Sequence, residues 1–314
     1  MNDLRTTSSL LNEEHLFQLA SLEAKARVVA DGLLVGRHSS RRFGSSSEFA
    51  EHKLYSPGDD LRHMDWKVFG RLDKHYVRRY EEETNLAAFL IVDPSNSMSY
   101  AGGAKGRFSV SKFEFAKTCA ASIAWLLHHK SDAAGLSIYF DDDKHEELLP
   151  SAREDQLRGL IQALENAKPR GKTVLAKQLQ YLASKIRRRS LVVVLSDFLD
   201  VDEGFLEPLA VLRRRGHDVI LLNTLDRDEV EFPFEGVVLF EDLEGEREEQ
   251  VDAASIKKAY LEEVEKHFSA IEQQAESFDL RFHRMLTDED LVHQLQIALS
   301  LAPSGKSLLQ SNRT

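Results

Sequence analysis

The sequence predicts an α/β fold with a doubly wound, mainly parallel sheet. Two segments, residues 86–92 and 190–195, are almost entirely apolar, as expected of parallel strands that are covered on both faces. Amphipathic stretches with helical spacing alternate with these and with shorter apolar segments. Alternation of strands and helices is typical of a parallel sheet with helices on both sides.

The first 83 residues differ in character from the rest of the chain. Leu16, Leu19, Ala20 and Ala24 lie at helical spacing and predict a helix over 13–29. The following segment is rich in Gly, Ser, Arg and His and lacks a sustained period. We therefore expect an irregular, β-rich segment there, which ends in a strand near 75–82.

The regular elements begin after this segment. Strands are predicted at 86–92, 135–140, 190–195, 218–222, 237–243 and 280–284. Helices are predicted at 111–130, 151–164, 174–186, 205–214, 252–277 and 288–301, the first two with capping boxes at Ser111 with Glu114 and at Ser151 with Glu154. The predicted organisation is an N-terminal helix and upstream segment packed on the main domain (1–83), the main domain (84–301) and a tail (302–314).

Composition narrows the possible functions. The net charge of −11 disfavours nucleic-acid binding. No apolar run approaches the roughly 20 residues of a membrane span, and the first twelve residues lack a signal-like apolar stretch, so we expect a cytoplasmic protein. The single cysteine, Cys119, excludes an internal disulfide and falls on the apolar face of a predicted helix, where we expect it to pack in the core.

Five oxygen-bearing side chains are predicted to gather at one edge of the sheet: Asp93, Ser95, Ser97, Thr173 and Asp197. The first three follow the strand at 86–92, Asp197 follows the strand at 190–195, and Thr173 lies just before a helix. Ligands of doubly wound sheets bind outside the carboxyl ends of the strands. Mg²⁺ (or Mn²⁺) prefers oxygen ligands and keeps several waters, so the hydroxyls can touch the ion while Asp93 and Asp197 hold its waters.

The pattern Asp-x-Ser-x-Ser with a distal Thr and Asp is similar to the metal-ion-dependent adhesion site of von Willebrand factor A domains. The segment 55–66, which contains Asp59, Asp60, Arg62, Asp65 and Trp66, resembles the signature of domain-of-unknown-function family 58. The resemblance implies a von Willebrand factor A-like fold, an adhesion-type site that binds a carboxylate of a partner protein, and association with MoxR-type AAA+ ATPases. It implies no enzymatic activity.

The segment 55–66 admits two interpretations. Its charged residues invite ion pairs and caps, and Trp66 supplies a large apolar anchor, which favours an ordered structural loop. The same density of charge also suits docking of a partner.

The alternative function is that of a metal-dependent hydrolase. A phosphatase would use Asp93 and Asp197, but such sites usually carry a second Asp two residues after the nucleophile, where this chain has Ser95. A nuclease would use Asp59, Asp65 and Lys67, but the gap is short for two hairpin strands and the net charge is acidic.

The structural interpretation of Trp66 predicts a large effect on stability. Truncating a buried aromatic side chain costs about 3–5 kcal/mol, whereas removing one hydroxyl from a hydrated ion site costs much less. In EDTA, Trp66→Ala should therefore melt well below Ser97→Ala. Melting of Trp66→Ala at the wild-type temperature would favour the docking role instead.

Overall fold

The structure is a computed structural model. It describes residues 13–35, 51–54, 76–79, 86–103, 106, 108–142, 144–241 and 248–300.

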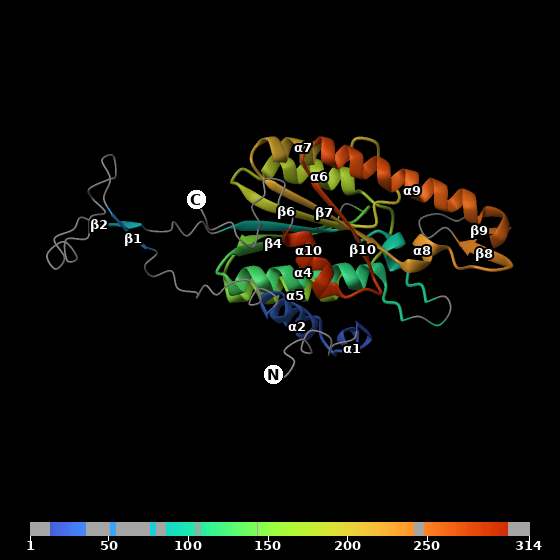
Figure 1. Ribbon diagram of the computed structural model, residues 1–314, viewed down its shortest axis with the longest axis horizontal. Coiled ribbons are helices and arrows are strands. Elements are labelled where there is room, and N and C mark those ends of the chain that lie inside the picture. The colour runs from blue at the N-terminus through green and yellow to red at the C-terminus, as the bar shows by residue number, and fades with distance from the viewer. Residues whose placement is uncertain are drawn as a thin grey trace.

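A six-stranded sheet forms the centre of the fold (Figure 1). Its strand order is β10-β7-β6-β3-β4-β5, and every neighbouring pair is parallel except β4 with β5. The strands are β3 (Ala87–Val92), β4 (Ala133–Tyr139), β5 (His145–Ser151), β6 (Ser190–Ser196), β7 (Asp218–Leu225) and β10 (Arg281–Leu286). The predicted doubly wound, mainly parallel α/β fold is confirmed.

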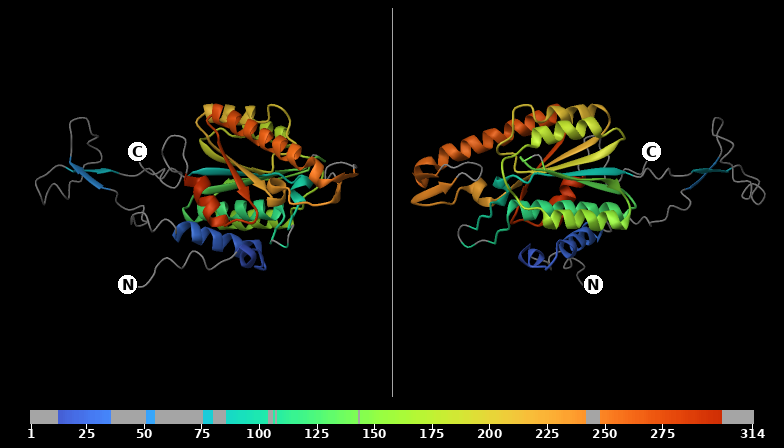
Figure 2. Two further views of the ribbon diagram at one scale, coloured as in Figure 1. Left: turned by 45° about the vertical axis from the view of Figure 1, so that its right-hand side comes forward. Right: turned by 180° about the vertical axis from the view of Figure 1, so that it is seen from behind.

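Helices cover both faces of the sheet (Figures 1 and 2). One face is covered by α4 (Lys112–His129), α5 (Glu154–Asn166) and α10 (Leu291–Ser300), and α2 (Leu22–Val35) packs on the outer side of α4. The other face is covered by α6 (Leu175–Lys185), α7 (Glu207–Arg214) and α9 (Ala253–Ser277).

The strand order places a topological switch point between β3 and β6. From β3 the chain moves outward to β4 and β5, and then returns to β6 on the other side of β3. Consecutive connections therefore leave in opposite directions and open a crevice at the carboxyl ends of these two strands, where ligands of such sheets bind.

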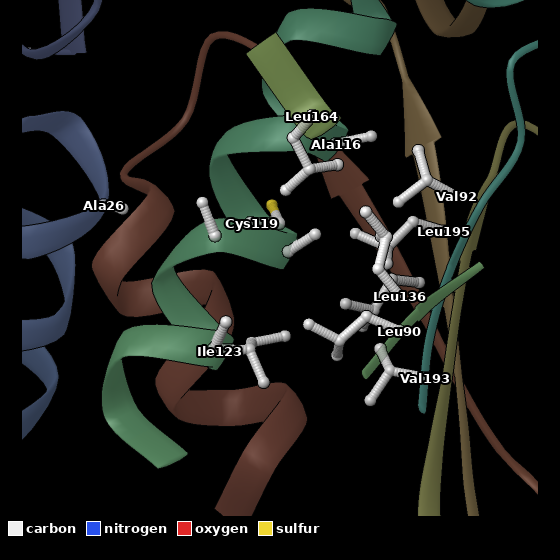
Figure 3. Close-up of a cluster of buried hydrophobic side chains, with 14 of the residues drawn as sticks. Ala26, Leu90, Val92, Ala116, Cys119, Ile123, Leu136, Leu164, Val193 and Leu195 are labelled. Atoms are coloured by element: carbon white, nitrogen blue, oxygen red, sulfur yellow. The ribbon is translucent and has the colours of Figure 1, made fainter. Parts of the chain in front are cut away.

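Helix α4 is the most deeply buried helix on its face of the sheet. Its N-cap is confirmed, because the Ser111 hydroxyl accepts a hydrogen bond from the Glu114 amide at 3.2 Å. Ala116, Cys119 and Ile123 lie on the side of α4 that packs against the sheet (Figure 3). Cys119 is fully buried, as predicted for a core residue.

The predicted single N-terminal helix is instead two helices, α1 (Glu13–Phe17) and α2. The Ser21 hydroxyl accepts a hydrogen bond from the Ala24 amide at 3.2 Å, which is the N-cap pattern of a new helix. Helix α2 buries Ala26, Val29 and Leu33 in the core formed with α4.

Strand β5 was not predicted, and the helix expected from Ser151 begins later. Ser151 is the last residue of β5, and α5 starts at Glu154 after an N-cap residue, Arg153, that makes no side-chain cap. An edge strand needs only one covered face. Three of the seven residues of β5 are exposed and four are polar, so it lacks the apolar run that marks a buried strand.

Two further departures follow β7. A short helix, α8 (Arg227–Glu231), was not predicted, and the acidic segment after β8 (Val237–Glu241) returns as β9 (Glu248–Asp252) to form an antiparallel hairpin.

Upstream, β1 (Glu51–Leu54) pairs with β2 (Tyr76–Arg79), which lies within the strand predicted near 75–82. Asp59, Asp60, Arg62, Asp65, Trp66, Lys67 and the tail at 302–314 lie outside the described residues. Nowhere in the described part of the chain is a helix both long and apolar enough to span a membrane.

Candidate metal site

Asp93 closes strand β3 at the switch point and is only 2% exposed. Its Oδ1 accepts a hydrogen bond from the Ser95 amide at 3.0 Å. Its Oδ2 accepts hydrogen bonds from the hydroxyls of Ser196 at 2.7 Å and Thr173 at 3.1 Å. The carboxylate is therefore held in one orientation by three donors from three segments of the chain.

The two predicted serines lie in and beside a short 3₁₀ turn, η2 (Asn96–Ser99). The Ser95 and Ser97 hydroxyl oxygens are 3.1 Å apart. The Ser99 hydroxyl donates to the Asn96 carbonyl at 2.6 Å and secures the turn. Two hydroxyl oxygens are thus presented side by side, close to the Asp93 carboxylate.

The loop that carries Thr173 is fastened to the segment after β3. The Arg170 amide donates to the Pro94 carbonyl at 2.8 Å, and the Asn96 amide donates to the Gly171 carbonyl at 2.9 Å. Gly171 has a φ of +68°, and a Cβ there would lie 2.3 Å from the Asp141 carboxylate. Only glycine satisfies both constraints, so Gly171 is needed to bring Thr173 to Asp93.

Asp197 follows β6 and is also 2% exposed. Its Oδ1 accepts from the Leu199 amide at 3.2 Å, and its Oδ2 accepts from the Lys112 ammonium at 2.7 Å. The structure thus links Asp93 with Thr173 and Ser95 with Ser97 by hydrogen bonds, and places Asp197 near enough for its charge to act on Asp93.

The sequence interpretation missed three polar side chains of this site: Ser196, Lys112 and Glu229. Ser196 is one more hydroxyl at a strand end and was hidden by the neighbouring Asp197. Lys112 occupies a position of the buried stripe of α4, four residues before Ala116, where an apolar residue is expected. A lysine on the buried stripe was the available signal. Glu229 lies in α8, which was not predicted.

Two buried carboxylates at one edge are electrostatically unfavourable. Burial raises the pKa of Asp93, and the negative charge of Asp197 raises it further, while hydrogen bonds from Ser196 and Ser95 oppose the shift. Asp197 has Lys112 as a counter-charge, whereas the partners of Asp93 are neutral donors. An additional cation at this edge would relieve the repulsion, and the nearby hydroxyls are ligands that Mg²⁺ accepts. The residues present therefore fit a divalent metal ion.

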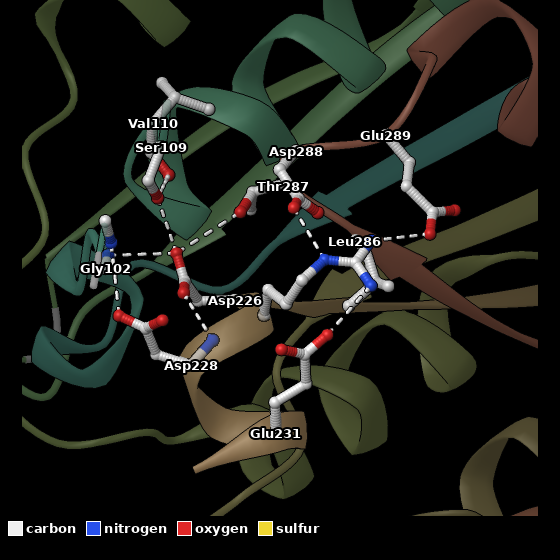
Figure 4. Close-up of polar contacts among 12 residues, drawn as sticks. Gly102, Ser109, Val110, Asp226, Asp228, Glu231, Leu286, Thr287, Asp288 and Glu289 are labelled. Carbon is white, nitrogen blue, oxygen red and sulfur yellow. Dashed lines mark hydrogen bonds and ion pairs between the residues drawn. The ribbon is translucent and has the colours of Figure 1, made fainter. Parts of the chain in front are cut away.

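A second polar network fastens the loop between η2 and α4 to helix α8 (Figure 4). Asp226, the N-cap of α8, accepts hydrogen bonds from the Gly102 amide at 2.9 Å and the Ser109 hydroxyl at 2.5 Å. Asp228 accepts from the Gly103 amide at 3.1 Å. These carboxylates are satisfied by amides and hydroxyls of the protein, so we assign the network a structural role.

Helix α8 is also tied to the segment before α10. Arg227 donates to Asp288 at 2.6 Å and to Glu289 at 2.7 Å (Figure 4). Since Glu229 of the same helix contacts Lys112, α8 links the candidate metal site to the C-terminal part of the sheet.

The fold and the site together define a doubly wound, mainly parallel α/β protein with a candidate metal site at its switch point. The family model described as "Protein of unknown function DUF58" matches residues 51–270. The chain is 31% identical over 240 residues to the uncharacterized protein Mb1516 of Mycobacterium bovis, covering 75% of this chain and 74% of that protein. The chain therefore belongs to the DUF58 family.

Solved structures show weaker similarity. An aerotolerance-related membrane protein from Bacteroides fragilis is 17% identical with a TM-score of 0.45, and the match covers 70% of this chain and 98% of that one. The SpRpn10 VWA domain is 11% identical with a TM-score of 0.37, and the match covers 68% of this chain and 94% of that one.

The electrostatics of Asp93 predict how its removal affects stability. Because its pKa is raised, the folded state binds a proton at this carboxyl more readily than the unfolded chain, and without metal the free energy of unfolding falls as pH rises through that pKa. In EDTA at pH 8, Asp93→Asn should raise the Tm, by about 2–4 °C for each kcal/mol gained. Added Mg²⁺ should stabilise the wild type but not this variant.

Asp132→Asn is a matched control, because Asp132 accepts a hydrogen bond from the Leu86 amide at the opposite end of the sheet. It should keep the full response to Mg²⁺. Thermal melts that place Asp93→Asn below the wild type in EDTA, or that give it an equal gain from Mg²⁺, would contradict this assignment.

Proposed function

We propose that this protein is a non-enzymatic protein-binding module whose Mg²⁺-dependent, adhesion-type site engages a carboxylate of a partner. The observation that carries the proposal is the set of neutral hydroxyls beside two buried carboxylates at the switch point. In this proposal Ser95, Ser97 and Thr173 touch the ion, while Asp93 and Asp197 hold its waters.

Neutral ligands determine what such a site can do. A divalent ion held by hydroxyls keeps most of its positive charge and supplies an exchangeable position for an external Asp or Glu side chain. Asp93 is held by three hydrogen bonds, and Asp197 is bound to Lys112. Donors of the protein therefore hold both carboxylates in fixed orientations, which suits holding the waters of the ion better than acting as a nucleophile or general base.

The partner is proposed in two steps. The chemistry calls for a protein that presents an Asp or Glu side chain. The family resemblance points to a MoxR-type AAA+ ATPase, or to a client that it remodels, with the present protein as a cytoplasmic adaptor in assembly or maturation of a protein complex.

The acidic C-terminal part supplies a second point of contact. Between residues 226 and 279 there are 18 Asp or Glu residues against five Lys or Arg, and the first half of α9 exposes Glu262 and Glu263. The β8–β9 hairpin and the start of α9 lie beyond the end of the sheet at which strand β3 finishes, which is also the end that carries the candidate metal site (Figure 1). Contact of this surface with a basic region of the partner would make association sensitive to salt.

The test is co-purification of a MoxR-type ATPase from the same organism with the full chain, in Mg²⁺ and in EDTA. We expect binding to the wild type in Mg²⁺, at least tenfold loss in EDTA, and similar loss with Ser97→Ala. Ser184→Ala is the matched control, because it also removes a hydroxyl that donates to the carbonyl three residues earlier, but at the end of α6 far from Thr173. It should bind like the wild type.

Equal binding by Ser97→Ala, with or without EDTA, would show that the partner docks elsewhere. The same preparations should lack turnover on phosphoesters, peptides and nucleic acids. A hydrolytic activity that survives purification and vanishes in Asp197→Ala would support the hydrolase alternative instead.

A further inference from the structure

Lys112 is a buried lysine that contacts Asp197, one of the five residues of the candidate metal site. Its side chain is 1% exposed. Its ammonium donates to Asp197 Oδ2 at 2.7 Å and to Glu229 Oε1 at 2.5 Å. These two carboxylates come from different segments, one after β6 and one in α8, and Lys112 joins them.

The location is unfavourable for a lysine apart from these two ion pairs and the Tyr100 ring, whose centroid lies 5.9 Å from the ammonium. Lys112 is the first residue of α4, where the helix dipole repels positive charge. Burial also disfavours the ammonium, and only Asp197 and Glu229 hold its pKa above the ordinary value. An apolar residue at this stripe position would satisfy packing, so packing alone does not account for the lysine.

Four charged side chains meet at the site. Asp93, Asp197 and Glu229 supply three carboxylates, and Lys112 supplies one ammonium. Asp226 and Asp228 lie nearby, but their carboxylates accept hydrogen bonds from the loop before α4. With the first four groups ionised, their net charge is −2, so they attract a further cation. The ammonium also occupies one oxygen of Asp197, a residue assigned to the metal.

We propose that Lys112 is an internal counter-cation that sets the strength of the metal site: it subtracts one charge from the carboxylates and shares Asp197 with the ion. Glu229 has the opposite effect, because it adds a negative charge and draws the ammonium away from Asp197. This inference rests on the proposed metal site. Lys112 thus keeps metal binding weak and reversible, and Glu229 limits how far it weakens that binding.

The experiment measures Mn²⁺ affinity by electron paramagnetic resonance at pH 8 and low ionic strength, on the full chain. The variants are Lys112→Gln, Glu229→Gln and the double variant, which bring the net charge to −3, −1 and −2. Lys112→Gln should bind at least about tenfold more tightly and Glu229→Gln at least about tenfold more weakly, because a unit charge interacts strongly with a divalent ion a few ångströms away. The double variant should return close to the wild type.

Lys117→Gln is the matched control. Lys117 is a second buried lysine of α4, but it pairs with Glu114. Its removal should leave Mn²⁺ affinity unchanged, which separates the effect of Lys112 from a general loss of charge in α4.

Some results would overturn the role of Lys112 alone, and others would overturn the metal site as well. Weaker binding by both Lys112→Gln and Glu229→Gln would mean that the ion pairs only orient Asp197, and it would overturn this inference while leaving the metal site intact. If Lys112→Gln does not fold by circular dichroism, unchanged or tighter binding by Glu229→Gln overturns the inference equally. Absence of Mn²⁺ binding by the wild type, or equal binding by Asp93→Ala, would overturn the proposed metal site and this inference with it.

Discussion

The parallel pairing of β3 with β6 is the constraint on which the candidate site depends. It sets Val92 beside Leu195, so that the residues that follow each strand, Asp93 and Asp197, emerge at one edge. Two buried carboxylates at the same edge of the sheet raise the free energy of the folded state unless cations or hydrogen bonds compensate their charges. The surrounding structure provides hydroxyls for one and an ammonium for the other.

This constraint explains why distant segments are fastened so firmly at this edge. The loop before α6 is bonded to the backbone after β3, and Gly171 permits the close approach. The loop before α4 is bonded to α8 through Asp226, and α8 in turn supplies Glu229 to Lys112. The site is therefore assembled by contacts between segments that lie far apart in the sequence.

Much of the fold could be predicted because buried parallel strands and amphipathic helices leave strong periodic patterns. The apolar runs before Asp93 and Asp197 fixed two central strands, and these placed the two carboxylates at one edge. Elements without such patterns were missed. Strand β5 has no buried residue, and α8 is too short to show a helical period, although Asp226 and Glu229 form a local capping box there. Lys112 was missed because a lysine is ordinarily assigned to the surface, and only the fold reveals the two carboxylates that hold it inside.

The central claim is that the five residues at the switch point bind one divalent ion. The most direct measurement is anomalous scattering from crystals of the full chain grown with Mn²⁺. We expect a single manganese peak in contact with the hydroxyls of Ser95, Ser97 and Thr173, with Asp93 and Asp197 beside it. Absence of a peak at this position, with the Thr173 hydroxyl still donating to Asp93, would contradict this assignment.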